Sequence, residues 1–225
     1  MYLRKTSSYS EFTRKLKVWH HNVRGTYSVQ SMLLKLAGES QVDIVAVVEA
    51  CSKTGTPPNP VPSYGYKLAF EFQGTNRVAF YIRRELGSWR ATRCFDFKAT
   101  VTVETEFDIV HFHEFYIPPN KISSWCIDDI AETLNAQGSH VIMGDFNLHH
   151  PWWGGDDIPR SRVRSLAKQI CEQLKGDGFI LANEPGKFTW ERKRNGQIEQ
   201  SIIDLMFVSG GESDYPKSLR ETAKN

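Results

Sequence analysis

The sequence has few cysteines, no long apolar run and no excess of charge of either sign. Its four cysteines among 225 residues form no Cys-x-x-Cys pair, which excludes a zinc knuckle and a dense disulfide framework and favours reduced thiols. The longest strongly apolar stretch, 42–50, contains Asp43 and Glu49 and is far shorter than the roughly 20 residues of a membrane span. The 28 basic and 26 acidic side chains leave a net charge of +2, so charge alone neither indicates nor excludes a nucleic-acid partner.

The first 15 residues are polar and mixed in charge. They lack the apolar core of a secretory signal peptide, and the chain has no Asn-x-Ser/Thr glycosylation site. We therefore expect an intracellular protein, nuclear or cytoplasmic, that is neither secreted nor placed in a membrane. Composition divides the chain into a polar extension over 1–15, one folded domain over 16–209 and a polar tail over 210–225.

Hydrophobic residues make up 40% of the chain and aromatic residues 12%, a balance typical of a globular domain with a substantial core. Alternating and helical apolar patterns follow one another along the domain. They predict strands over 16–23, 42–48, 66–70, 77–82, 99–103, 108–116 and 139–143, and helices over 28–37, 122–134 and 161–174. The segments 51–63, rich in Gly and Pro, and 151–159, rich in Gly, Trp and Asp, are predicted to be loops.

Two further strands, 187–194 and 197–208, are predicted on either side of Asn195-Gly196, because this dipeptide suits a type I′ hairpin turn. The total of at least eight strands is too large for one modest open sheet. We therefore expect a mixed α/β domain in which two sheets pack together and helices cover them outside.

Polar side chains end or interrupt the apolar strands. Asn22, Glu49, Asp145 and Asn147 lie at the ends of three of them, and Asp204 lies inside the apolar run 202–208. Ligands of layered α/β folds gather at strand ends, although an isolated Asp145 or Asn147 would more often be an ordinary turn residue. Asp204 needs a partner, since an unpartnered carboxylate among apolar neighbours is costly. Three carboxylates and two carboxamides form the oxygen-rich set that a hard cation such as Mg²⁺ binds.

These residues resemble a known family. Gly144-Asp145-Phe146-Asn147 and the segment 148–154 that follows resemble the Gly-Asp-Phe-Asn block of the endonuclease/exonuclease/phosphatase superfamily. The His-Pro-x-Trp-Gly extension in 150–154 most resembles the endonuclease domains of non-LTR (LINE-type) retrotransposons. Further matching segments stand in the family's order at 21–24, 47–49, 77–81, 116–119 and 201–204. One tetrapeptide is a modest signal, but an ordered set over 16–209 is a strong one.

The resemblance implies a four-layer α/β/β/α sandwich of two packed mixed sheets that cleaves a phosphodiester with Mg²⁺ or Mn²⁺, with DNA as its partner. It makes Glu49 the principal metal ligand, assisted by Asn22. Asp145 would orient or deprotonate the attacking water. The phosphate oxygens would be held by Asn147 and Tyr116. Asp204 would orient a catalytic histidine.

The resemblance also places a hairpin that probes the DNA minor groove at 188–204. Its arm and turn carry Arg192, Lys193 and Arg194, which could contact phosphates without reading base sequence. The alternative is a solvated basic turn. A second basic set, Arg160, Arg162 and Arg164, is expected on an exposed helix face.

The histidines carry a different expectation. His111-x-His113 and His149-His150 lack a further Cys or His at matching spacing, so we do not expect zinc. His20 and His21 are expected to be packing or surface residues.

The carboxyl-terminal part departs from the family. The family closes with Ser-Asp-His on a further strand, whereas here the last histidine is His150 and Ser213-Asp214 is followed by Tyr215. We therefore expect the last strand and its histidine to be missing, and Asp204 to be partly unpaired or to draw another donor. In that case Asp204→Asn should cost little stability.

Two hypotheses follow. In the first, the chain is a divalent-metal-dependent DNA endonuclease of the retrotransposon type, impaired by the missing histidine, from a parent protein that continues into a reverse transcriptase. In the second, it is an inactive, truncated nuclease fold that binds nucleic acid or a protein. Phosphatase substrates such as inositol phosphates or sphingolipids are a further alternative within the superfamily, but the segment 149–154 favours DNA.

Overall fold

The computed structural model describes residues 15–50, 64–70, 77–119, 125–155, 158, 164–194 and 196–209. Several sequence-based expectations therefore lie outside the described residues: most of the amino-terminal extension, the loop 51–63, Arg160, Arg162, Ser213-Asp214-Tyr215 and the tail.

The first sheet has four strands, in the order β1 (Val18–Asn22), β2 (Ile44–Val48), β4 (Val78–Arg83) and β3 (Tyr66–Leu68). β1 and β2 are parallel and joined by helix α1 (Tyr27–Glu39), and the other pairs are antiparallel. All five residues of β2 are buried, because alternate side chains pack against α1 and against the second sheet. This explains why its sequence is continuously aliphatic.

The second sheet has six strands. Their order is β5 (Trp89–Cys94), β6 (Lys98–Glu104), β7 (Ile109–Tyr116), β8 (Ser139–Asp145), β12 (Asp204–Ser209) and β9 (Phe179–Leu181). β7 and β8 are parallel, and the remaining pairs are antiparallel. Its outer face is covered by α2 (Trp125–Thr133), α3 (Pro151–Gly154) and α4 (Ser165–Gly176). Ile130, Trp153 and Leu174 of these helices pack on the sheet in one buried cluster.

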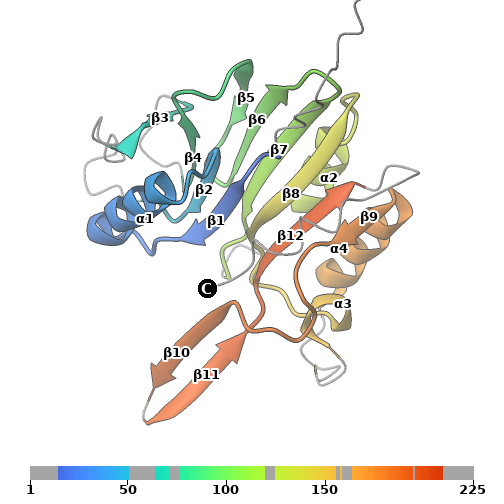
Figure 1. Cartoon of the computed structure of the whole chain (residues 1–225). Coiled ribbons are helices and arrows are strands. Elements are labelled where there is room, and N and C mark those ends of the chain that lie inside the picture. Colours follow the sequence, from blue (N-terminus) through green and yellow to red (C-terminus); the bar gives the residue numbers. More distant parts are fainter. Residues whose placement is uncertain are drawn as a thin grey trace, which may run out of the picture.

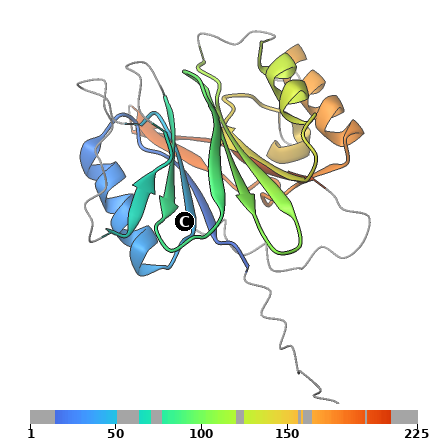
Figure 2. The same ribbon diagram turned by 90° about the horizontal axis from the view of Figure 1, so that it is seen from above.

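The two sheets pack face to face, with helices on both outer faces (Figure 1 and Figure 2). Val48 and Phe80 of the first sheet share a buried cluster with Val101, Phe112 and Met143 of the second. The expected mixed α/β class, with two packed mixed sheets, is confirmed. β1 is at the edge of its sheet, and within the described residues no strand follows β12.

The predicted second arm of the hairpin is two strands rather than one. β11 (Gln197–Ser201) pairs with β10 (Trp190–Arg194), and this ribbon projects away from both sheets (Figure 1). The strand is then interrupted at Ile202 and Ile203, and the chain continues in the second sheet as β12. The break is stabilised because the Thr189 hydroxyl accepts hydrogen bonds from the backbone N–H groups of Ile203 and Asp204.

The prediction of a loop over 151–159 is wrong at its start, where α3 forms one short helical turn. Pro151 stands in its first turn, and the side chain of His150 accepts a hydrogen bond from the backbone N–H of Trp152, so the turn has a favourable proline and a side-chain cap. No described helix is long and apolar enough to cross a membrane. The three cysteines within the described residues, Cys94, Cys126 and Cys171, form no disulfide with one another.

Candidate active site

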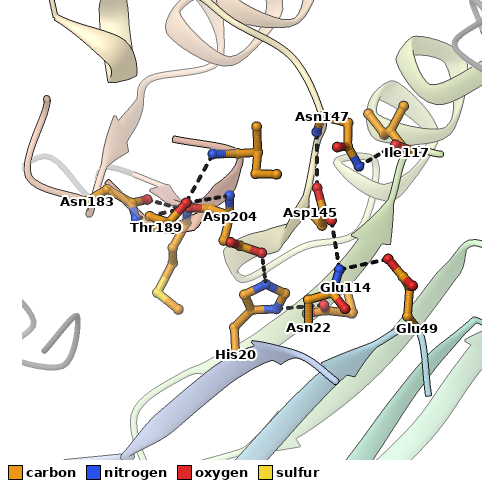
Figure 3. Close-up of polar contacts among 12 residues, drawn as sticks. His20, Asn22, Glu49, Glu114, Ile117, Asp145, Asn147, Asn183, Thr189 and Asp204 are labelled. Atoms are coloured by element: carbon orange, nitrogen blue, oxygen red, sulfur yellow. Dashed lines mark hydrogen bonds and ion pairs between the residues drawn. The ribbon is translucent and has the colours of Figure 1, made fainter. Parts of the chain in front are cut away.

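The centre of the site is the side-chain amide of Asn22. Parallel strands β1 and β2 end at the same edge of the first sheet, so Asn22 and Glu49 lie together there. The Asn22 amide nitrogen donates hydrogen bonds to Glu49 Oε1 and to Asp145 Oδ2, each over 2.9 Å (Figure 3). Asp145 ends β8 of the second sheet. One amide therefore joins two carboxylates from opposite sheets.

Tyr116 and Asn147 complete this group. Tyr116 ends β7 directly beside Asp145 in the strand register, and its hydroxyl donates to Glu49 Oε1 over 3.2 Å. The backbone N–H of Asn147 donates to Asp145 Oδ1 over 3.2 Å, and its side-chain amide donates to the Ile117 carbonyl over 3.1 Å. The structure thus brings together five of the six residues that the resemblance assigns to catalysis.

The backbone around these residues is locally constrained. Glu49 and Asn147 both have a φ of +48°, a left-handed conformation that is uncommon for residues other than glycine and is found at functional sites. Gly144, just before Asp145, has no room for a side chain, because a Cβ there would overlap the carbonyl of Phe115 on β7. The glycine of the Gly-Asp-Phe-Asn block is therefore required by the close approach of β7 and β8.

The pKa of Asp145 is strongly shifted. Burial raises the pKa of Asp145, and the neighbouring Asp204 raises it further. The Asn22 amide, His20 and the Asn147 N–H lower it, so that the pKa is about 7. Burial and then the Glu49 carboxylate raise the pKa of Tyr116, so its phenol stays protonated at neutral pH and remains a hydrogen-bond donor.

Asp204, the sixth residue, has a histidine partner after all. His20 on β1 places Nε2 3.2 Å from Asp204 Oδ1 and Nδ1 2.7 Å from Glu114 Oε1 (Figure 3). Asp204 therefore draws another donor, as one of the two expectations had it. His20 is thus a nearly buried residue with two carboxylate partners, whereas His21 is exposed. Asp204→Asn was expected to cost little stability only if Asp204 lacked a histidine partner. Because Asp204 contacts His20, that expectation no longer applies.

Sequence reasoning missed Glu114 and His20, although one signal was available. Side chains two residues apart on a strand point to the same face, so His20 shares a face with Asn22, and Glu114 shares one with Tyr116. Burial lowers the pKa of His20, but the carboxylates of Glu114 and Asp204 outweigh it and raise that pKa to about 10. His20 is therefore cationic at neutral pH.

The donor set suits a hard divalent cation. Within the described residues no group of three or more His, Cys, Asp or Glu side chains is placed to hold a metal. Mg²⁺, however, is commonly held by only one or two carboxylates with water completing its shell, and Glu49 and Asp145 converge on one point. Asn22, expected to assist as a metal ligand, does not present an oxygen to this point. Its oxygen accepts a hydrogen bond from the Arg24 backbone N–H over 2.8 Å, and its nitrogen donates to the two carboxylates.

A pocket of about 690 Å³ opens beside this group. Asn22 and Asp204 are in its wall, and Phe188 and Trp190 line it where the β10–β11 ribbon begins. The side chains of Arg192 and Lys193 are exposed on that ribbon. The side chain of Arg194 lies outside the described residues.

Comparisons with known proteins show which family and which folds this chain is similar to. Residues 110–223 match the family model described as endonuclease-reverse transcriptase. No curated protein matches the sequence. Among solved structures, the endonuclease domain of TRAS1, a telomere-specific non-LTR retrotransposon, superimposes with a TM-score of 0.67 at 18% identity over 87% of this chain and 85% of that one.

Two further solved structures have the same fold. The 3′ phosphatase NExo from Neisseria, bound to a product DNA hairpin, has a TM-score of 0.61 at 15% identity over 85% of both chains. An AP endonuclease from Archaeoglobus fulgidus has a TM-score of 0.53 at 14% identity over 87% of both chains. At these identities the similarity concerns the fold.

Proposed function

Because this chain belongs to the endonuclease-reverse transcriptase family, we propose that it is a divalent-metal-dependent DNA endonuclease that nicks a strand by water attack on a backbone phosphate. The observation that carries the proposal is the Asn22 amide, which gathers the carboxylates of Glu49 and Asp145 from two sheets onto one point. Similar folds occur in a retrotransposon endonuclease and in a phosphatase bound to DNA. The proposal includes a parent protein with a reverse transcriptase region, acting in the nucleus or cytoplasm.

Asp145 is the proposed general base. A base works best when its pKa is near the working pH, and burial beside Asp204 gives Asp145 a pKa of about 7. Its Oδ1 is held by the Asn147 N–H and its Oδ2 by the Asn22 amide, so the carboxylate has a fixed orientation. It can therefore orient a water molecule for attack on phosphorus and accept its proton.

Tyr116 and Asn147 are the proposed ligands of the phosphate oxygens. The Tyr116 hydroxyl donates its single proton to Glu49 Oε1 and would turn it to a phosphate oxygen when the substrate binds, whereas the Asn147 amide uses only one of its two N–H groups for the Ile117 carbonyl. Donors held in place before the reaction stabilise the charge that develops on the phosphate. Glu49 would hold Mg²⁺ or Mn²⁺, with Asn22 assisting by orienting the Glu49 carboxylate through its N–H group, and the bound cation would neutralise charge on the phosphate and the leaving oxygen.

The β10–β11 ribbon is the proposed DNA contact. Arg192 and Lys193 are exposed on it, and its base joins the pocket through Thr189, which binds the backbone of Asp204. DNA phosphates that lie along the ribbon would thus lead the strand to the carboxylates. Arg194 stays a predicted third contact.

A nicking assay on supercoiled plasmid tests the activity. With Mg²⁺ or Mn²⁺ the wild-type protein should nick, and Glu49→Ala and Asp145→Ala should each lower the rate at least about 100-fold, as expected for loss of charge stabilisation or of a general base. Glu106→Ala, at an exposed carboxylate in the β6–β7 turn, is the matched control and should retain the wild-type rate.

Equal background nicking by the wild type and both variants would refute the endonuclease. A DNA mobility shift without any nicking would instead support the alternative, a catalytically inactive module that binds nucleic acid. Chelation of the metal should abolish nicking by the wild type.

A further inference from the structure

His20 connects the two sheets beside the proposed active site. It belongs to β1 of the first sheet, yet both of its ring nitrogens contact carboxylates of the second sheet. Nε2 lies 3.2 Å from Asp204 on β12, and Nδ1 lies 2.7 Å from Glu114 on β7. In this part of the chain, one imidazole therefore ties three strands together.

The ring is placed to act through Asp204 and not on a substrate. Both nitrogens are occupied by carboxylates, and only 8% of the side chain is exposed. Glu114 is completely buried. Asp204 is 19% exposed, and both Asp204 and His20 line the pocket. A substrate in the pocket would therefore reach the Asp204 carboxylate more readily than the imidazole, whose two nitrogens already contact carboxylates.

We propose that His20 is a positioning residue of this nuclease site, which holds the Asp204 carboxylate at the pocket wall opposite Asp145. The inference rests on the proposed function. Asp204 and Asp145 face each other in the register of β12 and β8, where two carboxylates repel each other. The contact with His20 fixes Asp204 against that repulsion.

Glu114 has a supporting part in this arrangement. A histidine that holds a partner with one nitrogen is oriented by what binds the other. The buried Glu114 contacts Nδ1 and so sets the direction of Nε2 toward Asp204. Asp204 is also fixed by its backbone, since its carbonyl accepts from the Asn183 amide and its N–H donates to Thr189. The contact with His20 therefore sets the direction of the Asp204 side chain.

A double-mutant cycle on nicking tests whether the pair acts as a unit. His20→Ala and Asp204→Ala should each lower the single-turnover rate 10- to 100-fold, the range typical of outer-shell partners, with KM unchanged. The double variant should be no slower than the slower single variant, because groups that act as a unit are non-additive. Losses that multiply in the double variant would overturn the proposal.

Two further variants separate positioning from folding. His111→Ala removes another buried histidine, five residues before Tyr116 on β7, and should keep the wild-type rate below its melting temperature. Glu114→Gln keeps a hydrogen-bonding partner for Nδ1 and should retain most activity, whereas Glu114→Leu should lose as much as His20→Ala. Equal rates for Glu114→Gln and Glu114→Leu would overturn the role of Glu114, and with it the inference.

The outcomes distinguish this inference from the proposed function. A wild-type protein that does not nick refutes the endonuclease, and the role of His20 in it falls at the same time. A wild-type protein that nicks, with His20→Ala nicking at the same rate, refutes only the positioning role. Imidazole ¹⁵N spectra give a readout besides activity, in which Asp204→Asn should shift the Nε2 signal of His20. An unchanged signal would refute the contact.

Discussion

Histidines in this chain occupy two opposite electrostatic settings. His20 lies between two carboxylates, which raise its pKa to about 10 despite burial. His113 and His140 instead stack with ring centroids 5.3 Å apart, and Nε2 of His113 lies 3.0 Å from Nδ1 of His140. Burial, followed by the neighbouring histidines, lowers the pKa of His113 well below its usual value, and burial lowers that of His140.

The second group is a packing cluster. Its three rings, His111, His113 and His140, lie on the helix-covered face of the second sheet, and their other nitrogens contact two threonine hydroxyls and two carbonyls, those of Thr100, Thr102, Ala136 and Gln137. Nitrogens engaged in this way are not presented to a metal. All six ring nitrogens of this cluster therefore have a hydrogen-bonding partner.

The contribution of His113 to stability should consequently fall in mild acid. A histidine with a lowered pKa in the folded state binds its proton more readily when unfolded, so the stability it contributes is complete above pH 6.5 and is lost as pH falls below that value. We expect His113→Gln to make the free energy of unfolding fall less steeply between pH 7 and 5, as measured by urea titration. The comparison at pH 8, where the ring is neutral in both states, is the control. Identical slopes would contradict the lowered pKa.

At the scale of elements, the strands that sequence patterns missed are the two edges of the second sheet. β5 is mostly exposed and has an irregular register between Ala91 and Arg93, so it lacks an apolar alternation. β9 has only three residues, of which Phe179 alone is buried. An edge strand has a neighbouring strand on one side only and buries fewer apolar side chains. Prediction from apolar patterns is therefore weakest for such strands.

The proposed contact between the β10–β11 ribbon and DNA phosphates can be measured directly. Each phosphate contact made by a cation contributes about 0.9 to the slope of log affinity against log salt. The double variant Arg192→Ala/Lys193→Ala should bind duplex DNA more weakly and lower that slope by about two, measured by fluorescence anisotropy. The matched pair Arg84→Ala/Arg90→Ala, exposed around the far edge strand β5, should leave the slope unchanged. A ribbon that is only a solvated turn would give equal slopes for both pairs.

At the scale of the whole molecule, the proposed site exists only because two sheets meet. Asn22 and Glu49 belong to the first sheet, whereas Tyr116, Asp145 and Asp204 belong to the second. A cation held at Glu49, with Asp145 beside it, would bridge the sheets. Its binding therefore reports on the folded molecule, since the unfolded chain does not gather these carboxylates.

Metal binding should accordingly raise the melting temperature. A ligand that binds only the folded state stabilises it by about 2.7 kcal/mol at 100 times its dissociation constant. We expect Mg²⁺ to raise the melting temperature of the wild type and of Glu106→Ala, but not of Glu49→Ala, in differential scanning calorimetry. The same rise in Glu49→Ala would place the cation elsewhere.

The sequence alone predicted most strands and helices of the fold and part of the candidate site. Nearly continuous aliphatic residues in 42–48 and the apolar pattern of 108–116 indicated strands, and the polar residues at strand ends indicated a site, because backbone periodicity and desolvation act locally. The exact composition of the site could not be read in this way. The contact between His20 and Asp204 joins residues 184 positions apart, and no local pattern encodes such a distance.

The order and types of the residues in this chain already required buried strands, polar strand ends and a hairpin turn. Tertiary packing alone chose which strands became neighbours. Tertiary packing set Asp204 opposite Asp145 and interrupted the predicted strand 197–208 after β11. It also brought His20 of the first strand to the Asp204 carboxylate. The physical reason is that burial of two apolar sheet faces fixes the register of every strand at once, and the polar side chains at their ends must pair with whatever that register brings near.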